Sequence, residues 1–170
     1  MSRIKQFIPE GICLKCQGCC RFREQNSVWA PCILEEEIQD LLDKDLPPAL
    51  ISVDRKLRLI PDPQAEGFIC PFFGPEENKC KIYDLRLFEC QLYPFLINLR
   101  GKKVLLTVDL NCPYAKEKLN SKEFSEYTEY LINFLNSPAQ IGILKDNPQI
   151  IQAYEEVSDI VELKDFDETK

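Results

Sequence analysis

The chain has 170 residues, of which 45% are hydrophobic, and its net charge is −7 because 28 acidic residues outnumber 21 basic ones. This length predicts one domain over residues 1–170, which can bury a core without the help of disulfides. The acidic balance disfavours nucleic-acid phosphates and no segment holds the ~20 apolar residues of a membrane span, so neither nucleic acid nor membrane is expected as a partner.

The first feature along the chain is a group of four cysteines within eight residues. They stand in the order Cys13-Leu-Lys-Cys16-Gln-Gly-Cys19-Cys20, in a chain that has no histidine. When two cysteines are separated by two residues, the backbone between them can turn around one soft metal ion, so that both thiolates bind it. Backbone N–H groups of the turn then donate to the sulfurs. Because neighbouring side chains are expected to diverge, Cys20 is a candidate for a second site or a bridging role.

A disulfide framework is the alternative use of the nine cysteines. The first ten residues lack the long apolar run of a secretory signal, which predicts a reducing, cytoplasmic location. The number of cysteines is also odd. These features favour metal ligation, whereas export of the chain would favour disulfides.

The segment from Trp29 to Lys44 is predicted to contain a surface helix with one buried face. Its apolar residues at helical spacing are Leu34, Ile38, Leu41 and Leu42. The acidic run of residues 35–37 is expected to form a solvated first turn, where the helix dipole favours negative charge, rather than a metal site. Cys32 has no cysteine at ligand spacing and is expected to be a buried thiol that fills space.

Residues 55–80 are rich in turn-forming residues and contain one predicted strand, residues 56–60, before Pro61. Further along, the run Phe68-Ile-Cys70-Pro-Phe-Phe surrounds a cysteine with apolar side chains. Such a cluster is either plain core or a barrier that excludes water from a metal site, and the two roles are compatible.

Two β-rich runs, residues 93–100 and 103–110, flank Gly101 and predict an antiparallel hairpin. Cys90 and Cys112 stand at its two feet. Pairing of the runs is expected to bring these two cysteines together, where they can meet the N-terminal group.

Residues 120–163 are predicted to form C-terminal helices. One helix starts at the capping-box pattern Asn120-Ser-Lys-Glu123 and ends at Ser137-Pro138, and a second starts at Asn147-Pro148. The apolar residues at helical spacing in the second are Ile150, Tyr154, Val157 and Val161. The whole chain therefore predicts an α+β fold: a small single domain with a cysteine-rich metal core, one antiparallel hairpin or small sheet, and C-terminal helices.

The cysteine motifs resemble those of the YkgJ-type cysteine-cluster family, whose members are described as zinc- or iron-chelating domains with a CxxCxxCC signature. The motifs occur in the family's order over residues 13–113. After the signature they are Phe68-x-Cys70, Cys80-x-Ile-Tyr83-x-x-Arg86, Cys90, Tyr93-Pro-Phe and Cys112. The metal ligands that the resemblance implies are Cys13, Cys16, Cys19, Cys20, Cys70, Cys80, Cys90 and Cys112. Cys32 lies outside the signature, and the chain departs from the family at Leu87, usually proline, and at Gln91, often arginine.

The resemblance also places Tyr83 and Arg86 beside the cysteines. Arg86 is expected either to be a cation that stabilises nearby thiolates or to bond carbonyl groups in the turn before Cys90. Tyr83 is expected to be a packed aromatic residue rather than a reacting group.

Two kinds of metal centre suit eight thiolates. Two sets of four sulfurs fit two tetrahedral zinc ions. The spacing from Cys13 to Cys19 also matches the opening of a bacterial ferredoxin run, and Cys70-Pro and Cys112-Pro match the Cys-Pro that closes such runs. Sulfur ligands accept either metal, so we expect an iron-sulfur cluster in protein purified without oxygen and zinc in aerobic preparations.

The sequence leaves three functions open. The first is a metal-binding protein with a structural or redox role. The second is an S-adenosylmethionine-dependent protein lysine N-methylase, because flagellin lysine N-methylases are similar in their cysteine pattern. That hypothesis has little other support, since the six glycines form no GxGxxG and no histidine is present for acid-base chemistry. The third is an acidic protein-interaction module with a structural metal. No catalytic residue is assigned.

Overall fold

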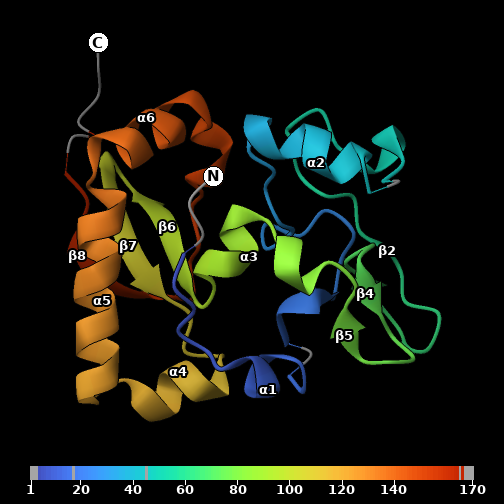
Figure 1. The fold of residues 1–170 in the computed structure, drawn as a ribbon, viewed down its shortest axis with the longest axis horizontal. Coiled ribbons are helices and arrows are strands. Elements are labelled where there is room, and N and C mark those ends of the chain that lie inside the picture. The colour runs from blue at the N-terminus through green and yellow to red at the C-terminus, as the bar shows by residue number, and fades with distance from the viewer. Residues whose placement is uncertain (1–3, 17, 45, 165, 167–170) are drawn as a thin grey trace. The chain divides into compact units, whose positions relative to one another are not determined.

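The computed structural model describes residues 4–16, 18–44, 46–164 and 166. It is a mixed α+β structure with three small antiparallel sheets and with helices near the C-terminus, which confirms the predicted fold class (Figure 1). The chain divides into two compact units, residues 1–91 and 92–170, here called unit 1 and unit 2. Each unit is described by itself, and the single-domain organisation stays a prediction.

Unit 1 is built from short elements. Its helical segments are α1 (Glu10–Cys13), η1 (Gly18–Cys20), η2 (Glu35–Glu37), α2 (Ile38–Leu42), η3 (Pro48–Leu50), η4 (Tyr83–Leu85) and α3 (Phe88–Leu92), whose last residue belongs to unit 2. Its strands are β1 (Arg21–Phe22), β2 (Ile60–Pro61), β3 (Phe68–Ile69), β4 (Phe73–Gly74) and β5 (Lys79–Cys80). β3 lies between β1 and β2 in one sheet, and β4 pairs with β5 in another.

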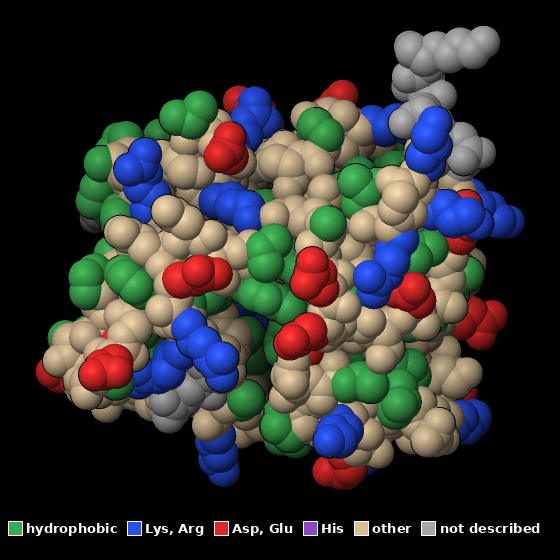
Figure 2. All heavy atoms as spheres, turned by 180° about the vertical axis from the view of Figure 1, so that it is seen from behind, with side chains coloured by type: hydrophobic (Ala, Val, Ile, Leu, Met, Phe, Trp, Pro, Cys, Tyr) green, Lys and Arg blue, Asp and Glu red, His purple; other side chains and the backbone are tan. Residues whose placement is uncertain are grey.

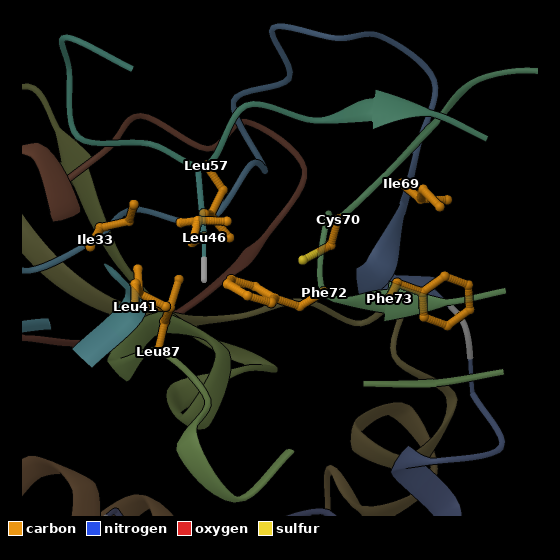
Figure 3. Close-up of a cluster of buried hydrophobic side chains, with 9 residues drawn as sticks. All are labelled: Ile33, Leu41, Leu46, Leu57, Ile69, Cys70, Phe72, Phe73 and Leu87. Carbon is orange, nitrogen blue, oxygen red and sulfur yellow. The ribbon is translucent and has the colours of Figure 1, made fainter. Parts of the chain in front are cut away.

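The core of unit 1 is a cluster of nine buried side chains that includes one of the cysteines (Figure 3). Its members are Ile33, Leu41, Leu46, Leu57, Ile69, Cys70, Phe72, Phe73 and Leu87. Three further cysteines, Cys20, Cys80 and Cys90, pack against this cluster. Cys32 is fully buried, as the sequence predicted. Apolar packing therefore already brings several distant cysteines of the sequence to one core.

The helix predicted between Trp29 and Lys44 is present as η2 followed by α2, but its acidic start is not wholly solvated. Glu37 is only 7% exposed. Its carboxylate accepts hydrogen bonds from the backbone N–H of Leu34 (3.0 Å) and of Phe88 (2.6 Å). The expectation of three solvated acidic residues is therefore wrong for Glu37, because the free N–H groups at the start of α3 supply it with a buried partner.

The strand predicted over residues 56–60 is wrong in its bounds. Lys56 and Leu57 form only isolated bridges, and the regular pairing is that of β2 at Ile60–Pro61 with β3. β2 is an edge strand, where a proline can be accommodated because its missing N–H need not face a partner. Pro61 therefore falls inside the strand rather than after it.

Unit 2 holds the longest elements of the chain. They are β6 (Phe95–Arg100), β7 (Lys103–Val108), α4 (Pro113–Lys118), α5 (Lys122–Leu135), α6 (Pro138–Asp146), η5 (Pro148–Ile150) and β8 (Ser158–Glu162). β6 and β7 form the predicted hairpin, with Gly101 at a φ of +62° in its turn. Helix α5 covers the sheet, since the ring of Phe95 lies 5.5 Å from that of Phe124 and 5.3 Å from that of Tyr127, centroid to centroid.

The second C-terminal helix predicted from Asn147 is wrong. That stretch forms one short turn, η5, and then strand β8, which pairs antiparallel with β7. Asn98, fully buried on β6, bonds both backbone groups of Tyr154 and so holds the connection in an extended form. The open edge of β7 provides pairing partners that sequence periodicity cannot reveal. The second helix that does exist is α6, which begins at Pro138, where the first was expected only to end.

Two surface properties concern the partners that the sequence disfavours. Within the part of the chain that the structure describes, no helix is long and apolar enough to cross a bilayer. Acidic and basic side chains are interspersed over the face drawn in Figure 2.

Candidate metal centre

The eight cysteines of the signature are divided between the units. Seven lie in unit 1, whereas Cys112 lies in unit 2 as the buried residue that precedes α4. All nine cysteines of the chain are described, and none of them is joined in a disulfide. The expected meeting of Cys112 with the other cysteines stays a prediction, because each unit is described by itself.

Short helical turns position the first four thiols. Cys13 is the last residue of α1, and the backbone N–H of Cys16 bonds the carbonyls of Ile12 and Cys13, both at 3.1 Å, so the turn continues past the helix. η1 then carries Cys19 and Cys20, whose Sγ atoms lie 4.0 Å apart. The expectation that these neighbouring side chains diverge is therefore wrong. Their separation is close to the about 3.8 Å that two sulfurs of one tetrahedral zinc site would have with Zn–S bonds of about 2.3 Å.

Cys70 and Cys80 stand at turns that aim backbone N–H groups at their sulfurs. The N–H groups of Phe72 and Phe73 bond the Cys70 sulfur, and the N–H of Ile82 bonds the Cys80 sulfur. Pairing of β4 with β5 sets Phe73 opposite Cys80, so the two turns lie side by side. Such N–H donors stabilise a negatively charged sulfur, which is how metal-bound cysteines are supported.

Cys20 is tied to the same place by its backbone. Its carbonyl accepts a hydrogen bond from the N–H of Cys70 at 3.1 Å, next to the pairing of β1 with β3. This contact joins the N-terminal cysteine group to the core at a separation of 50 residues in the sequence. No local pattern could have predicted it.

Cys19 lies near the thiols of Cys70, Cys80 and Cys90. The Cys20 thiol, through its hydrogen bond, and burial raise the pKa of Cys19 well above its ordinary value. Burial raises the pKa of Cys70 to about 12 and that of Cys90 well above its usual range, and proximity to Cys19 contributes to both shifts. Burial also raises the pKa of Cys80, with further contributions from Cys19 and Cys13. The thiols are thus close enough to repel one another once charged, and an ion of positive charge would relieve that repulsion.

Arg86 lies at the edge of this group with its guanidinium held from several sides. Nη1 lies 3.8 Å from the sulfur of Cys13, Nη2 donates to Gln6 Oε1 at 2.8 Å, and Nε donates to the carbonyl of Tyr83 at 3.0 Å. The guanidinium carbon also lies 3.7 Å from the centre of the Tyr83 ring. The two expected arrangements of Arg86, beside a thiol and bonded to a carbonyl of its own turn, therefore occur together.

Two glutamines near Arg86 were not predicted from the sequence. Gln6 accepts from the guanidinium, and Gln91 donates from Nε2 to the Arg86 carbonyl at 2.7 Å while its Oε1 accepts from the N–H of Ile4 at 3.3 Å. These bonds attach the start of the chain to the segment before α3. Gln91 is one of the two positions at which the sequence was expected to depart from the pattern of the family it resembles, and that expectation was the one available signal.

The donor set fits a soft metal, although the side chains do not yet surround one point. Within the described residues, no three cysteine, aspartate or glutamate side chains already stand in a metal-binding arrangement. The side chains would therefore have to turn toward a shared ion. Thiols that act on one another's pKa values, backbone N–H groups that bond the sulfurs of Cys70 and Cys80, and a guanidinium near Cys13 are groups that suit a zinc or iron centre.

Comparison with known proteins points the same way. The family described as "CxxCxxCC: Putative zinc- or iron-chelating domain" matches residues 12–113. The chain is also similar to the uncharacterized protein MJ0661 of Methanocaldococcus jannaschii, with 26% identity over 133 residues that cover 72% of this chain and 69% of the relative. No solved structure matches the chain.

Proposed function

Since the chain belongs to the CxxCxxCC family of zinc- or iron-chelating domains, we propose that it binds a soft metal centre through its cysteine thiolates and that this centre has a structural or redox role. The proposed ligands are Cys13, Cys16, Cys19, Cys20, Cys70, Cys80, Cys90 and Cys112. Seven of them belong to unit 1, and Cys112 is proposed as the eighth from the family signature.

The observation that carries this proposal is the gathering of thiols around Cys19. Cysteines from three separate stretches of sequence act on one another's pKa values. Burial of that many sulfurs would be costly if they were charged, and if they were neutral they would contribute only packing. Thiolates bind metal only after losing their protons, so an ion of positive charge is the partner that makes this arrangement favourable.

Arg86 is proposed to support the centre from outside the ligand set. Its charge lowers the pKa of Cys80, and its Nη1 lies against the sulfur of Cys13. A guanidinium at this place offsets part of the negative charge that four thiolates carry around a divalent ion. Tyr83 holds the guanidinium flat through its ring.

Zinc and an iron-sulfur cluster use the same donors, and the family description allows both metals. We propose a cytoplasmic, reducing location, in which the thiols stay available for metal. An iron-sulfur cluster would favour the redox role, whereas closed four-sulfur zinc sites would favour the structural one.

The test is to purify the full chain without oxygen and to measure zinc, iron and acid-labile sulfide per chain. We expect either brown protein with iron and sulfide or colourless protein with zinc. Cys70→Ser should lose most of the metal, while the matched variant Cys32→Ala, which also removes a buried thiol, should keep it. Wild-type protein without bound metal, or equal losses from the two variants, would contradict the proposal.

A further inference from the structure

Packing divides the thiols of unit 1 into two groups. Cys70 belongs to the buried core cluster drawn in Figure 3, and Cys20, Cys80 and Cys90 pack against that cluster. Cys16 is exposed, and Cys13 is partly exposed at the end of a helix, α1, that has no buried residue. One side of the thiol group is therefore seated in the core, and the other faces solvent.

The helix that ends at Cys13 has no buried residue, and the apolar side chains that next pack against the core cluster are those of Cys20 and Phe22. None of the described residues from 8 to 26 is buried, whereas Phe7 before them and Ser27 after them are. The segment joins the core at Cys20, through the bond of its carbonyl to the N–H of Cys70, and at the two-residue strand β1. Segments with few buried contacts open at a lower free energy than the core they cover.

Within the exposed side, the two thiols are held differently. Cys13 lies against the guanidinium of Arg86, which is itself fixed by Tyr83 and Gln6. Cys16 lies one turn further on, at the exposed end of the same helical segment. Cys16 is therefore the thiol that can move away from the core-seated group with the least loss of packing.

On the basis of the metal-binding function proposed above, we propose that Cys13 and Cys16 form the side of the metal site that opens and closes. The other ligands of this four-sulfur site come from the core-seated thiols, the segment of residues 8–16 covers the site, and the metal enters and leaves past Cys16.

The first test follows the release of zinc from the full chain to a chromophoric chelator in stopped flow. Cys16→Ser should still take up zinc when zinc is in excess, but should bind it more weakly than the wild type and release it at least tenfold faster. Cys32→Ala should release zinc at the wild-type rate, and Cys70→Ser should hold little or none. Release from Cys16→Ser at the wild-type rate, or loss of zinc as complete as in Cys70→Ser, would overturn the proposal.

The second test does not depend on any variant folding. Amide hydrogen exchange of the wild-type chain is compared before and after zinc is added. Protection should rise by tenfold or more in peptides from residues 8–16 and should change less around β3, β4 and β5. An equal rise in protection throughout unit 1 would overturn the proposal that Cys13 and Cys16 form the opening side. A wild-type chain that takes up no zinc would instead overturn the metal-binding function itself.

Discussion

The guanidinium of Arg86 is fixed by its neighbours before it reaches the sulfur of Cys13. The guanidinium carbon lies 3.7 Å from the centre of the Tyr83 ring, and its N–H groups donate to the Gln6 side chain at 2.8 Å and to the Tyr83 backbone carbonyl at 3.0 Å. Together these contacts fix its orientation. Lysine could supply the charge but neither the flat stack nor the fork of donors. The position therefore calls for arginine in particular.

Substitution of Arg86 should weaken metal binding without removing a ligand. We expect Arg86→Gln to lower the zinc affinity by about tenfold or more, because partners that support metal ligands typically contribute factors of this size. Arg86→Lys should fall between Arg86→Gln and the wild type. The measurement is a competition titration against a chelator of known affinity, with the exposed Arg58→Gln as control. Unchanged affinity in Arg86→Gln would show that the contact with Cys13 has no effect on the metal.

Single residues also show what a sequence can and cannot disclose. The burial of Cys32 followed from its apolar neighbours and its distance from the ligand spacing, and it is confirmed. The partnership of Gln6 with Arg86 spans 80 residues and left no trace in either local sequence. A contact between surface-type residues far apart in the chain has no periodicity by which it could be recognised.

Among the elements, the hairpin was predictable and β8 was not. β6 and β7 carry β-rich runs around a glycine turn, so that local preference and final pairing agree. β8 exists because β7 has a free edge, and helical spacing of its apolar residues was misleading. The N-cap of α5 shows a smaller error, since Ser121 rather than Asn120 accepts the capping bond from Phe124.

The buried carboxylates of Glu37 and Glu89 connect residues 32–37 to the start of α3. Glu37 bonds the N–H groups of Leu34 and Phe88, and Glu89 accepts from the N–H of Cys32 at 2.6 Å. Burial raises the pKa of Glu37 from 4.5 to about 7, despite those two hydrogen bonds. The Glu37 carboxyl group therefore changes its charge within the neutral pH range.

The raised pKa of Glu37 makes the stability of unit 1 depend on pH. The folded state keeps a proton that the unfolded chain loses above about pH 4.5, so the contribution to stability is full below that pH and is lost as pH rises through about 7. A shift of this size corresponds to at most about 3 kcal/mol. We expect denaturant unfolding of the wild type to show this decline between pH 5 and 8 relative to Glu37→Gln.

The comparison cancels pH effects that both proteins share, including the pH dependence of metal binding, provided that both are measured in the same metal-loaded state. Identical pH profiles for the wild type and Glu37→Gln would contradict the assignment of the titrating group to Glu37.

At the scale of the whole molecule, the two units differ in how much regular structure they contain. Every strand of unit 1 has two residues, whereas unit 2 has a hairpin of two six-residue strands and a helix of 14 residues. Isolated short pairings contribute little stability by themselves. Unit 1 therefore has the greater need of a metal centre to hold its loops together.

Removal of metal should accordingly affect the two units unequally. We expect a chelator to lower amide protection in unit 1, most strongly in residues 8–16, because structural metal sites contribute directly to folding. Amide exchange in β6, β7 and α5 of unit 2 should change little. Hydrogen exchange with and without chelator measures both, and a uniform loss of protection over the whole chain would contradict this division.

The sequence by itself determined the thiol chemistry, the family and the long hairpin, because ligand spacing and β-rich runs around a glycine are written in consecutive residues. Only the tertiary structure decided which thiols are seated in the core, which face solvent, and that Arg86 lies beside Cys13. These outcomes depend on which distant apolar side chains pack around Cys70. Packing of that kind is set by the whole chain at once, so no local stretch of sequence could have specified it.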